Sequence, residues 1–211
     1  MTVEVTPIVL LDVQKQQPVV AELRHGIEEA QLADWEGEWL PELFKALQRL
    51  KRAGVERAQW PQSRHWDWRR KTKAVEGFLG APAFCITCDG LTQGMMIVDL
   101  DRHQARIDGQ AGKPLVYVDF VENAPWNRPE LNNPPRFRGV GSVLIRAAIA
   151  LSHHYEYKGR IGLHSLPQAH NFYANTCGMT DLGQDEHYDR LRYFEMTSEQ
   201  ADAFITKGGK S

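Results

Sequence analysis

The clearest hydrophobic pattern in this chain lies between Glu38 and Ala53. Leucine or phenylalanine occupies positions 40, 43, 44, 47 and 50, a spacing that places these side chains on one stripe of an α-helix. Gly54 then ends the segment. A polar stretch containing Trp60-Pro61 follows, and a second helix is expected from about Ser63 to Phe78.

Alternating or continuous apolar runs predict strands elsewhere in the chain. Polar residues from Gln14 to Pro18 end the first strand. Two later strands are expected to form a hairpin, because Asp89-Gly90 between them is a strong turn signal. The expected strands are Val3–Val13, Phe84–Cys88, Thr92–Leu100 and Leu115–Val121.

A long apolar run from Val143 to Leu151 predicts a buried helix, and the residues before it suggest a ligand site. Gly139 and Gly141 at the helix entrance leave backbone N–H groups uncovered, so a phosphate can approach them and the positive end of the helix dipole. Arg136 and Arg138 add full positive charges. The segment therefore predicts a cradle for a pyrophosphate.

Other interpretations of this turn are weaker. A dinucleotide fingerprint would need glycine where Leu144 stands, and no strand is expected directly before the turn. A Walker-type phosphate loop would end in Gly-Lys-Ser/Thr, whereas Gly141 is followed by Ser142-Val143. An Arg-Gly-rich turn without any ligand stays open as the structural alternative.

A second motif, His170–Met179, lies further along the chain. Together the two segments resemble the GNAT (GCN5-related) N-acetyltransferase superfamily. Its signature is Arg/Gln-x-x-Gly-x-Gly/Ala at the start of the helix that holds coenzyme A, followed by Phe-Tyr-x-x-x-Gly-Phe. Met179 replaces the last Phe, and the resemblance covers Leu115 to about Thr197. The matching positions are Arg136, Gly139 and Gly141 in the first motif and Phe172, Tyr173 and Gly178 in the second.

The resemblance implies an α/β (α+β) fold with a mixed, mostly antiparallel central sheet, split by a cofactor cleft and flanked by helices. Arg160–Ser165 would be a short buried strand, and residues 1–211 would form a single GNAT-like domain. The implied co-substrate is acetyl-CoA and the implied partner is an amine acceptor. The implied cofactor-binding residues are Arg136, Arg138, Gly139, Val140, Gly141, Ser142 and Asn171.

Acetyl transfer to an amine needs a base for the amine proton and an acid for the thiolate. Tyr173 matches the family's leaving-group acid, and a phenol with a pKa of about 10 stays protonated near neutrality; a core tyrosine is the alternative. Glu122 is the first choice for the base and Asp119 the second. Since they are three positions apart on one strand, only one of them faces the acceptor. For either, an ion pair with an arginine is the structural alternative.

Composition limits the class of protein. With 211 residues, 42% hydrophobic and 25% charged, the chain is expected to be one globular domain. A net charge of −2 argues against a nucleic-acid binder, and no apolar segment or leader predicts a membrane protein. Three cysteines suggest a reducing, cytoplasmic compartment. Cys85 and Cys88 would point to opposite faces of a strand, and the histidines show no ligand spacing, so no metal is expected.

Two segments lie outside the motifs. Residues 123–135 separate the expected strand from Arg136, and their four prolines predict a stiff loop. This loop either shapes a substrate site or is a packed surface excursion. Trp60, Trp66 and Trp68 alternate with basic residues, so they either wall an acceptor pocket or pack a helix.

Two functions from different classes follow. The first is an N-acetyltransferase that modifies a primary amine of a small molecule or of a protein or peptide. The second is a catalytically silent acyl-CoA sensor or protein-binding module. Tyr173 favours the enzyme, because a binding module needs no leaving-group acid. A toxin that acetylates aminoacyl-tRNA is a narrower alternative that the negative net charge disfavours. A homodimer stays open, and the sequence does not identify the acceptor.

Overall fold

The computed structural model describes residues 4–208, so Val3 of the first predicted strand lies outside the described residues. Apolar and β-branched side chains recur along the strands, as a pleated and half-buried surface requires. The strands are β1 (Val5–Asp12), β2 (Gln17–His25), β3 (Ala83–Cys88), β4 (Leu91–Asp99), β5 (Val116–Asn123), β6 (Phe137–Arg138), β7 (Ile161–Ser165), β8 (Thr180–Asp185) and β9 (Leu191–Met196).

The helical segments include two π-helical turns, Trp35–Trp39 and Phe172–Thr176. Short 3-10 turns cover Arg57–Gln59, Gln62–His65, Pro125–Asn127 and Pro167–Ala169. The α-helices are α1 (Glu29–Asp34), α2 (Leu40–Arg52), α3 (Trp68–Val75), α4 (Val140–His154) and α5 (Ser198–Gly208).

The described strands form a nine-stranded sheet in the order β6-β1-β2-β3-β4-β5-β7-β9-β8. The pairs β1–β2, β2–β3, β7–β9 and β8–β9 are antiparallel, whereas β5 and β7 are parallel. The predicted fold class, a mixed and mostly antiparallel sheet flanked by helices, is confirmed.

Contacts divide the chain into two compact units. The first unit takes in the described residues up to Phe78, then Pro82–Met96 and Val121–Leu144. The second takes in Leu79–Ala81, Ile97–Phe120 and the described residues from Ile145 onward. Strands β4 and β5 and helix α4 each contribute residues to both units. The expectation of a single domain stays a prediction.

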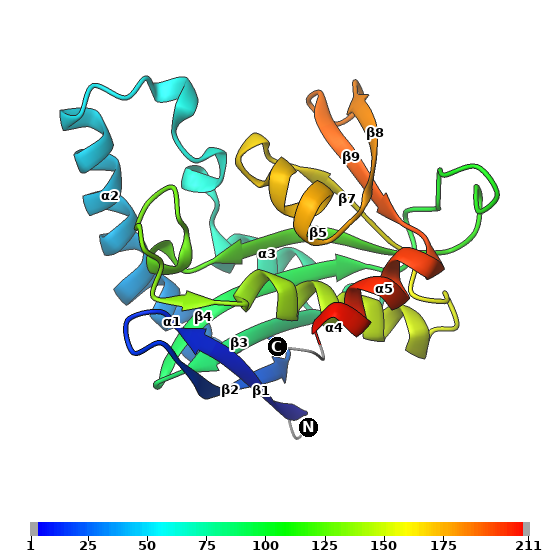
Figure 1. Ribbon diagram of the computed structural model, residues 1–211, viewed down its shortest axis with the longest axis horizontal. Coiled ribbons are helices and arrows are strands. Elements are labelled where there is room, and N and C mark those ends of the chain that lie inside the picture. The colour runs from blue at the N-terminus through cyan, green and yellow to red at the C-terminus, as the bar shows by residue number, and fades with distance from the viewer. Residues whose placement is uncertain (1–3, 209–211) are drawn as a thin grey trace. The chain divides into compact units, whose positions relative to one another are not determined.

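In the first unit, β1 and β2 form the blue hairpin of Figure 1. On the other side of β1 lies β6, which pairs Leu11 with Arg138 and Asp12 with Phe137. The side chains of Leu10 and Phe137 are each only 1% exposed, so this edge of the sheet has a packed inner face. The short strand β6 leads directly into α4.

In the second unit, β8 and β9 form the orange hairpin of Figure 1. Every residue of β7 pairs with β9, from Ile161 with Met196 to Ser165 with Arg192. The parallel pairing of β5 with β7 joins Val116 to Ile161 and Tyr117 to Gly162. Among the described residues this register covers only those two positions, so β5 and β7 separate after Tyr117. A fork of this kind is the split that the resemblance predicted for the sheet.

Several predicted elements differ from the structure. Strand β2 was not predicted, because Gln17–His25 alternates too weakly between apolar and polar residues. The predicted helix from Ser63 to Phe78 is a 3-10 turn followed by the shorter α3, which begins after Asp67 caps its first turn through Arg70 N at 2.9 Å. The helix predicted for Glu38–Ala53 is confirmed as the end of a π-helical turn followed by α2.

Candidate functional site

The entrance of α4 is an exposed turn built around a glycine. Gly139 has a φ of +100°, a conformation that residues with a Cβ adopt only with strain. The N–H of Val143 donates to the Gly139 carbonyl at 2.9 Å. This is the first hydrogen bond of the helix. The N–H groups of residues 140–142, which come before Val143, have no acceptor within the helix. The predicted absence of a strand before the turn is wrong, because β6 ends at Arg138.

Helix α4 lies very close to the sheet at this end. A Cβ on Gly94 of β4 would be 2.7 Å from Val140 Cγ1 and 3.1 Å from Leu144 Cδ1. Val140 and Leu144 are 2% and 0% exposed. Glycine at position 94 therefore permits the first turn of α4 to pack closely against β4.

The two predicted arginines have different surroundings. Arg136 Nη2 donates to Asp89 Oδ2 at 2.8 Å, in the β3–β4 turn, and its guanidinium lies 4.8 Å from the centre of the Phe137 ring. Arg138 is exposed. A bound polyanion would therefore meet two different guanidinium groups. The guanidinium of Arg136 is already paired with Asp89, whereas that of Arg138 is more accessible.

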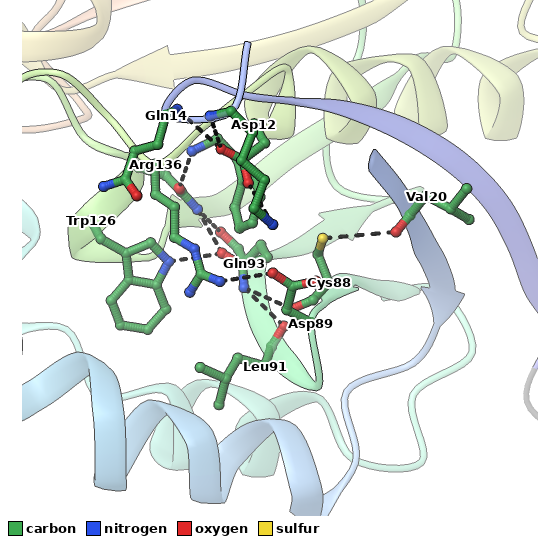
Figure 2. A network of polar contacts seen from close by, with 12 residues as sticks. Asp12, Gln14, Val20, Cys88, Asp89, Leu91, Gln93, Trp126 and Arg136 are labelled. Atoms are coloured by element: carbon green, nitrogen blue, oxygen red, sulfur yellow. Dashed lines mark hydrogen bonds and ion pairs between the residues drawn. The ribbon is translucent and has the colours of Figure 1, made fainter. Parts of the chain in front are cut away.

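The long loop between β5 and β6 is anchored by the amide of Gln93, which is fully buried. Its Oε1 accepts from Trp126 Nε1 at 2.8 Å and from Asn127 Nδ2 at 2.9 Å. Asn127 Oδ1 in turn accepts from the N–H of Phe137 at 3.0 Å. Figure 2 shows Gln93 and Trp126 next to Arg136, whose N–H donates to the Trp126 carbonyl. These bonds anchor the loop beside the entrance of α4; its stiffness stays a prediction.

Glu122, in the first unit, is a buried carboxylate with both oxygens engaged. Trp68 Nε1 donates to Oε2 at 2.7 Å and Arg128 Nη1 to Oε1 at 3.1 Å. The side chains of Glu122 and Arg128 are each 8% exposed. Burial raises the pKa of Glu122, although the Arg128 charge opposes this shift. Trp68, of the predicted tryptophan cluster, is thus a packed side chain with a polar partner. Sequence analysis did not identify Arg128 as the partner of Glu122.

Asp119 belongs to the second unit and is more accessible, with its side chain 26% exposed. Arg102 Nη2 donates to Asp119 Oδ2 at 3.3 Å and also binds Asp99. Each candidate base therefore has an arginine beside it, as the structural alternative anticipated. Neither role is decided by this geometry, and both stay predictions.

Tyr173 lies in the π-helical turn Phe172–Thr176 and is 5% exposed. Its ring centre is 5.9 Å from that of Phe194. Burial, followed by the nearby Cys177, raises the pKa of the Tyr173 phenol, so the hydroxyl keeps its proton at neutral pH. Asn171, two residues earlier, is exposed, and its Oδ1 is 3.5 Å from Asn175 Nδ2.

Among the described residues, neither the cysteines nor the potential metal ligands form a candidate site. The three cysteines are free and buried, and burial raises the pKa of the Cys85 thiol to about 12. Within residues 4–208, no group of three His, Cys, Asp or Glu side chains could hold a metal ion. In the same part of the chain, no helix has the length and apolar character needed to cross a membrane.

The α4 entrance has the features of an anion-binding turn. It offers uncovered N–H groups, a glycine with positive φ, and arginines on both sides of Phe137. A further observation concerns Asn123 at the end of β5. Its Oδ1 is buried without a hydrogen-bond partner, and it lies 3.4 Å from where a Gly94 Cβ would be. A buried acceptor in this position has the polarity to receive an N–H donor from a ligand.

Comparisons with known proteins give structural likeness without sequence likeness. No protein-family model matches the chain, and no curated protein matches it. Among solved structures, Mycobacterium smegmatis RimJ in complex with CoA-disulfide is similar with a TM-score of 0.52 and 15% identity, over 97% of this chain and 94% of that one. A GNAT-family acetyltransferase from Listeria monocytogenes 4b F2365 has a TM-score of 0.48 and 13% identity, over 84% and 95%.

At such low sequence identities, a structural likeness shows a shared fold and nothing more. The RimJ comparison spans nearly the whole of both chains. The likeness to RimJ shows that this chain has the GNAT fold.

Proposed function

We propose that this protein is an N-acetyltransferase that uses acetyl-CoA to acetylate a primary amine, on a small molecule or on a protein or peptide. The observation that carries the proposal is the exposed start of α4, where Gly139 at φ +100° follows β6 and precedes a buried helix. The likeness to RimJ, which was solved with CoA-disulfide, supports the choice of ligand.

In this proposal, the N–H groups of residues 138–142 bind the pyrophosphate, and Arg136 and Arg138 balance its charge. Asn171 is exposed and lies two residues before Tyr173 in the sequence. Its side-chain amide is proposed to hydrogen-bond the pantetheine arm. Acetyl-CoA supplies the activated thioester. The protein supplies the positioning and the proton transfers.

Tyr173 is proposed to protonate the leaving thiolate. Its raised pKa keeps the phenol protonated, which is the state that an acid requires. Glu122 and Asp119 are the two acidic candidates for the base. A raised pKa favours Glu122 as a proton acceptor, whereas greater exposure favours Asp119.

Two matched glycine variants test the cradle. Gly139 and Gly54 both have positive φ, +100° and +71°, and a Cβ would meet only Leu10 at 3.6 Å in the first case and nothing within 4 Å in the second. Gly139→Ala should weaken coenzyme A binding by about tenfold or more, roughly 1.4 kcal/mol, whereas Gly54→Ala should not. Isothermal titration calorimetry measures both affinities.

Unchanged affinity in a folded Gly139→Ala protein would show that the cradle is elsewhere. Amine-dependent release of the free thiol from acetyl-CoA tests turnover. Coenzyme A binding without thiol release, over a broad panel of primary amines, would identify an acyl-CoA sensor or binding module instead.

A further inference from the structure

Three side chains of the second unit form a continuous hydrogen-bonded chain. Tyr117 Oη, on β5, lies 2.6 Å from His164 Nδ1, on β7. The other imidazole nitrogen, Nε2, lies 3.1 Å from Asp185 Oδ2, at the end of β8. Tyr117 is 3% exposed, and the side chains of His164 and Asp185 are 3% and 10% exposed. This phenol–imidazole–carboxylate arrangement has the connectivity of a proton relay.

The direction of the protons follows from Asp185. Arg106 and the N–H of His187 also donate to this carboxylate, and the Arg106 hydrogen bond holds its pKa well below the usual range. An ionised carboxylate can only accept, so His164 carries its proton on Nε2. The lone pair of Nδ1 is then the acceptor, and Tyr117 must donate its hydroxyl proton to His164.

Stacked rings fix the plane of the relay. Tyr188 lies flat on His164, with centres 3.9 Å apart and planes 9° apart. His103 lies flat on Tyr117 at 3.6 Å and 14°. Burial lowers the pKa of His164, so the imidazole is neutral at neutral pH and able to accept a proton. The titratable or charged groups around His164 are Asp185 on β8, Arg106 and His103 in the loop before β5, Tyr117 on β5, Tyr188 in the β8–β9 turn and Tyr193 on β9.

The relay lies at the fork of the sheet. Tyr117 is the last residue of β5 in the described pairing with β7, opposite Gly162, and His164 follows two positions later on the same face. The phenol–imidazole bond therefore spans the point where the strands separate. The Tyr117 hydroxyl donates its proton to the hydrogen bond with His164. The lone pairs of its oxygen can therefore accept a hydrogen bond from a group that enters the fork.

We propose that Tyr117, His164 and Asp185 carry away the proton of the acceptor amine, an inference that rests on the proposed acetyltransferase function. When the amine nitrogen has bonded to the acetyl carbon, its N–H proton passes to Tyr117 Oη, and the N–H electron pair stays on nitrogen. In the same step the phenol proton passes to His164 Nδ1. Asp185 stabilises the resulting imidazolium, which later returns one proton to water. Tyr117 is the catalytic residue, and His164 and Asp185 are positioning residues.

The relay differs chemically from the acidic candidates. Both oxygens of Glu122 already accept hydrogen bonds, from Trp68 and Arg128, whereas the relay holds a neutral base and an oxygen with spare acceptor capacity. If the relay is the base, Glu122→Gln should leave the pH dependence of catalysis unchanged, and His164→Gln should alter it.

The test uses Tyr117→Phe, His164→Gln and Asp185→Asn, with Tyr193→Phe as the control. Tyr193 is 2% exposed and donates to Glu195 at 3.1 Å, so the control loses a buried hydroxyl from the same cluster without interrupting the relay. Initial rates of thiol release are measured from about pH 5 to pH 9 with the best of three probes: glycinamide, benzylamine and an N-terminal alanyl peptide.

Tyr117→Phe and His164→Gln should each lower kcat/KM by roughly 10²-fold at neutral pH, with coenzyme A affinity unchanged. This deficit should shrink below the His164 pKa, where the wild-type relay is itself blocked by protonation. A structural defect would give the same deficit at every pH. Asp185→Asn should move the acidic limb of the profile to lower pH, because the imidazolium loses its carboxylate.

An independent readout comes from ¹⁵N NMR of the free protein, which should show His164 protonated at Nε2 and not at Nδ1 near neutral pH. The opposite tautomer would overturn the relay. Wild-type kcat/KM in a folded Tyr117→Phe protein would also overturn it and leave the acetyltransferase proposal intact. If the wild-type protein released no thiol with any of the amines, the acetyltransferase proposal would fail, and the relay with it.

Discussion

The contact between Gly94 and the first turn of α4 supports a quantitative prediction for Gly94→Ala. The new methyl would lie 2.7 Å from Val140 Cγ1, 3.1 Å from Leu144 Cδ1 and 3.4 Å from Asn123 Oδ1. Neither Val140 nor Leu144 can turn toward solvent, because they are 2% and 0% exposed. Overpacking of this kind costs about 1–3 kcal/mol. For a chain of this size the melting temperature should fall by roughly 2–4 °C per kcal/mol.

The same substitution should weaken coenzyme A binding, because the strain is relieved most easily by moving the helix start that forms the cradle. Differential scanning calorimetry and titration calorimetry measure the two effects. Gly37→Ala is the matched control, since Gly37 is exposed and a Cβ there meets nothing within 4 Å. This control should change stability by no more than about 1 kcal/mol.

A double variant isolates the cause. Val140→Ala removes the Cγ1 that the new methyl would meet, so Gly94→Ala should cost less in that background than in the wild type. The expected interaction energy is about 0.5–3 kcal/mol for residues in contact. The reasoning is refuted if Gly94→Ala unfolds within about 1 °C of the wild type, or if its cost is the same with and without the Val140 side chain.

Three further predictions concern single side chains. Tyr173→Phe should lower kcat by roughly 10²-fold with little change in coenzyme A affinity, and equal losses of both would indicate a structural tyrosine. Gln93→Met should leave the indole N–H of Trp126 and the side-chain amide of Asn127 without their acceptor and destabilise the protein by about 1–3 kcal/mol; limited proteolysis should then cut residues 123–135 faster than in the wild type. Burial lowers the pKa of His103 from 6.5 to about 4. As pH drops from about 6.5 toward 4, His103 is protonated in the unfolded chain but not in the folded protein, so the free energy of unfolding falls. His103→Phe keeps a ring on Tyr117 but cannot be protonated, so urea unfolding should show a smaller acid loss, and an unchanged loss would contradict this assignment.

Local signals predicted the elements that depend on local sequence. The Asp89-Gly90 turn is formed with both residues at positive φ, because this dipeptide tolerates that conformation wherever it occurs. The buried helix after Gly139 was predicted well, since an apolar run of this length has few other structures available. The fork between β5 and β7 was implied by the family resemblance and not by the residues themselves.

Features that depend on distant partners were not predicted. The periodicity between Glu38 and Ala53 identified the shared face of α2, but Phe44 on that face is 63% exposed. It lines a groove of about 410 Å³ together with Leu40 and Leu47. Periodicity shows which side chains share a face, and it does not show what the face contacts. The bonds of Gln93 to Trp126 and Asn127 were likewise invisible, because they join segments far apart in the chain.

The edge strand β6 has a consequence for the order in which this protein folds. Arg138 joins the sheet by pairing with Leu11. The turn before α4 is therefore complete only after the long stretch of chain between Leu11 and Arg138 has closed into a loop. Closing such a loop costs more entropy than forming the local hairpins, and contacts of high sequence separation slow folding. During synthesis, the β1–β2 hairpin leaves the ribosome before β6 and keeps an open edge until β6 arrives. We therefore expect hydrogen-exchange protection of Phe137 and Arg138 to develop later in refolding than protection of the β1–β2 hairpin itself.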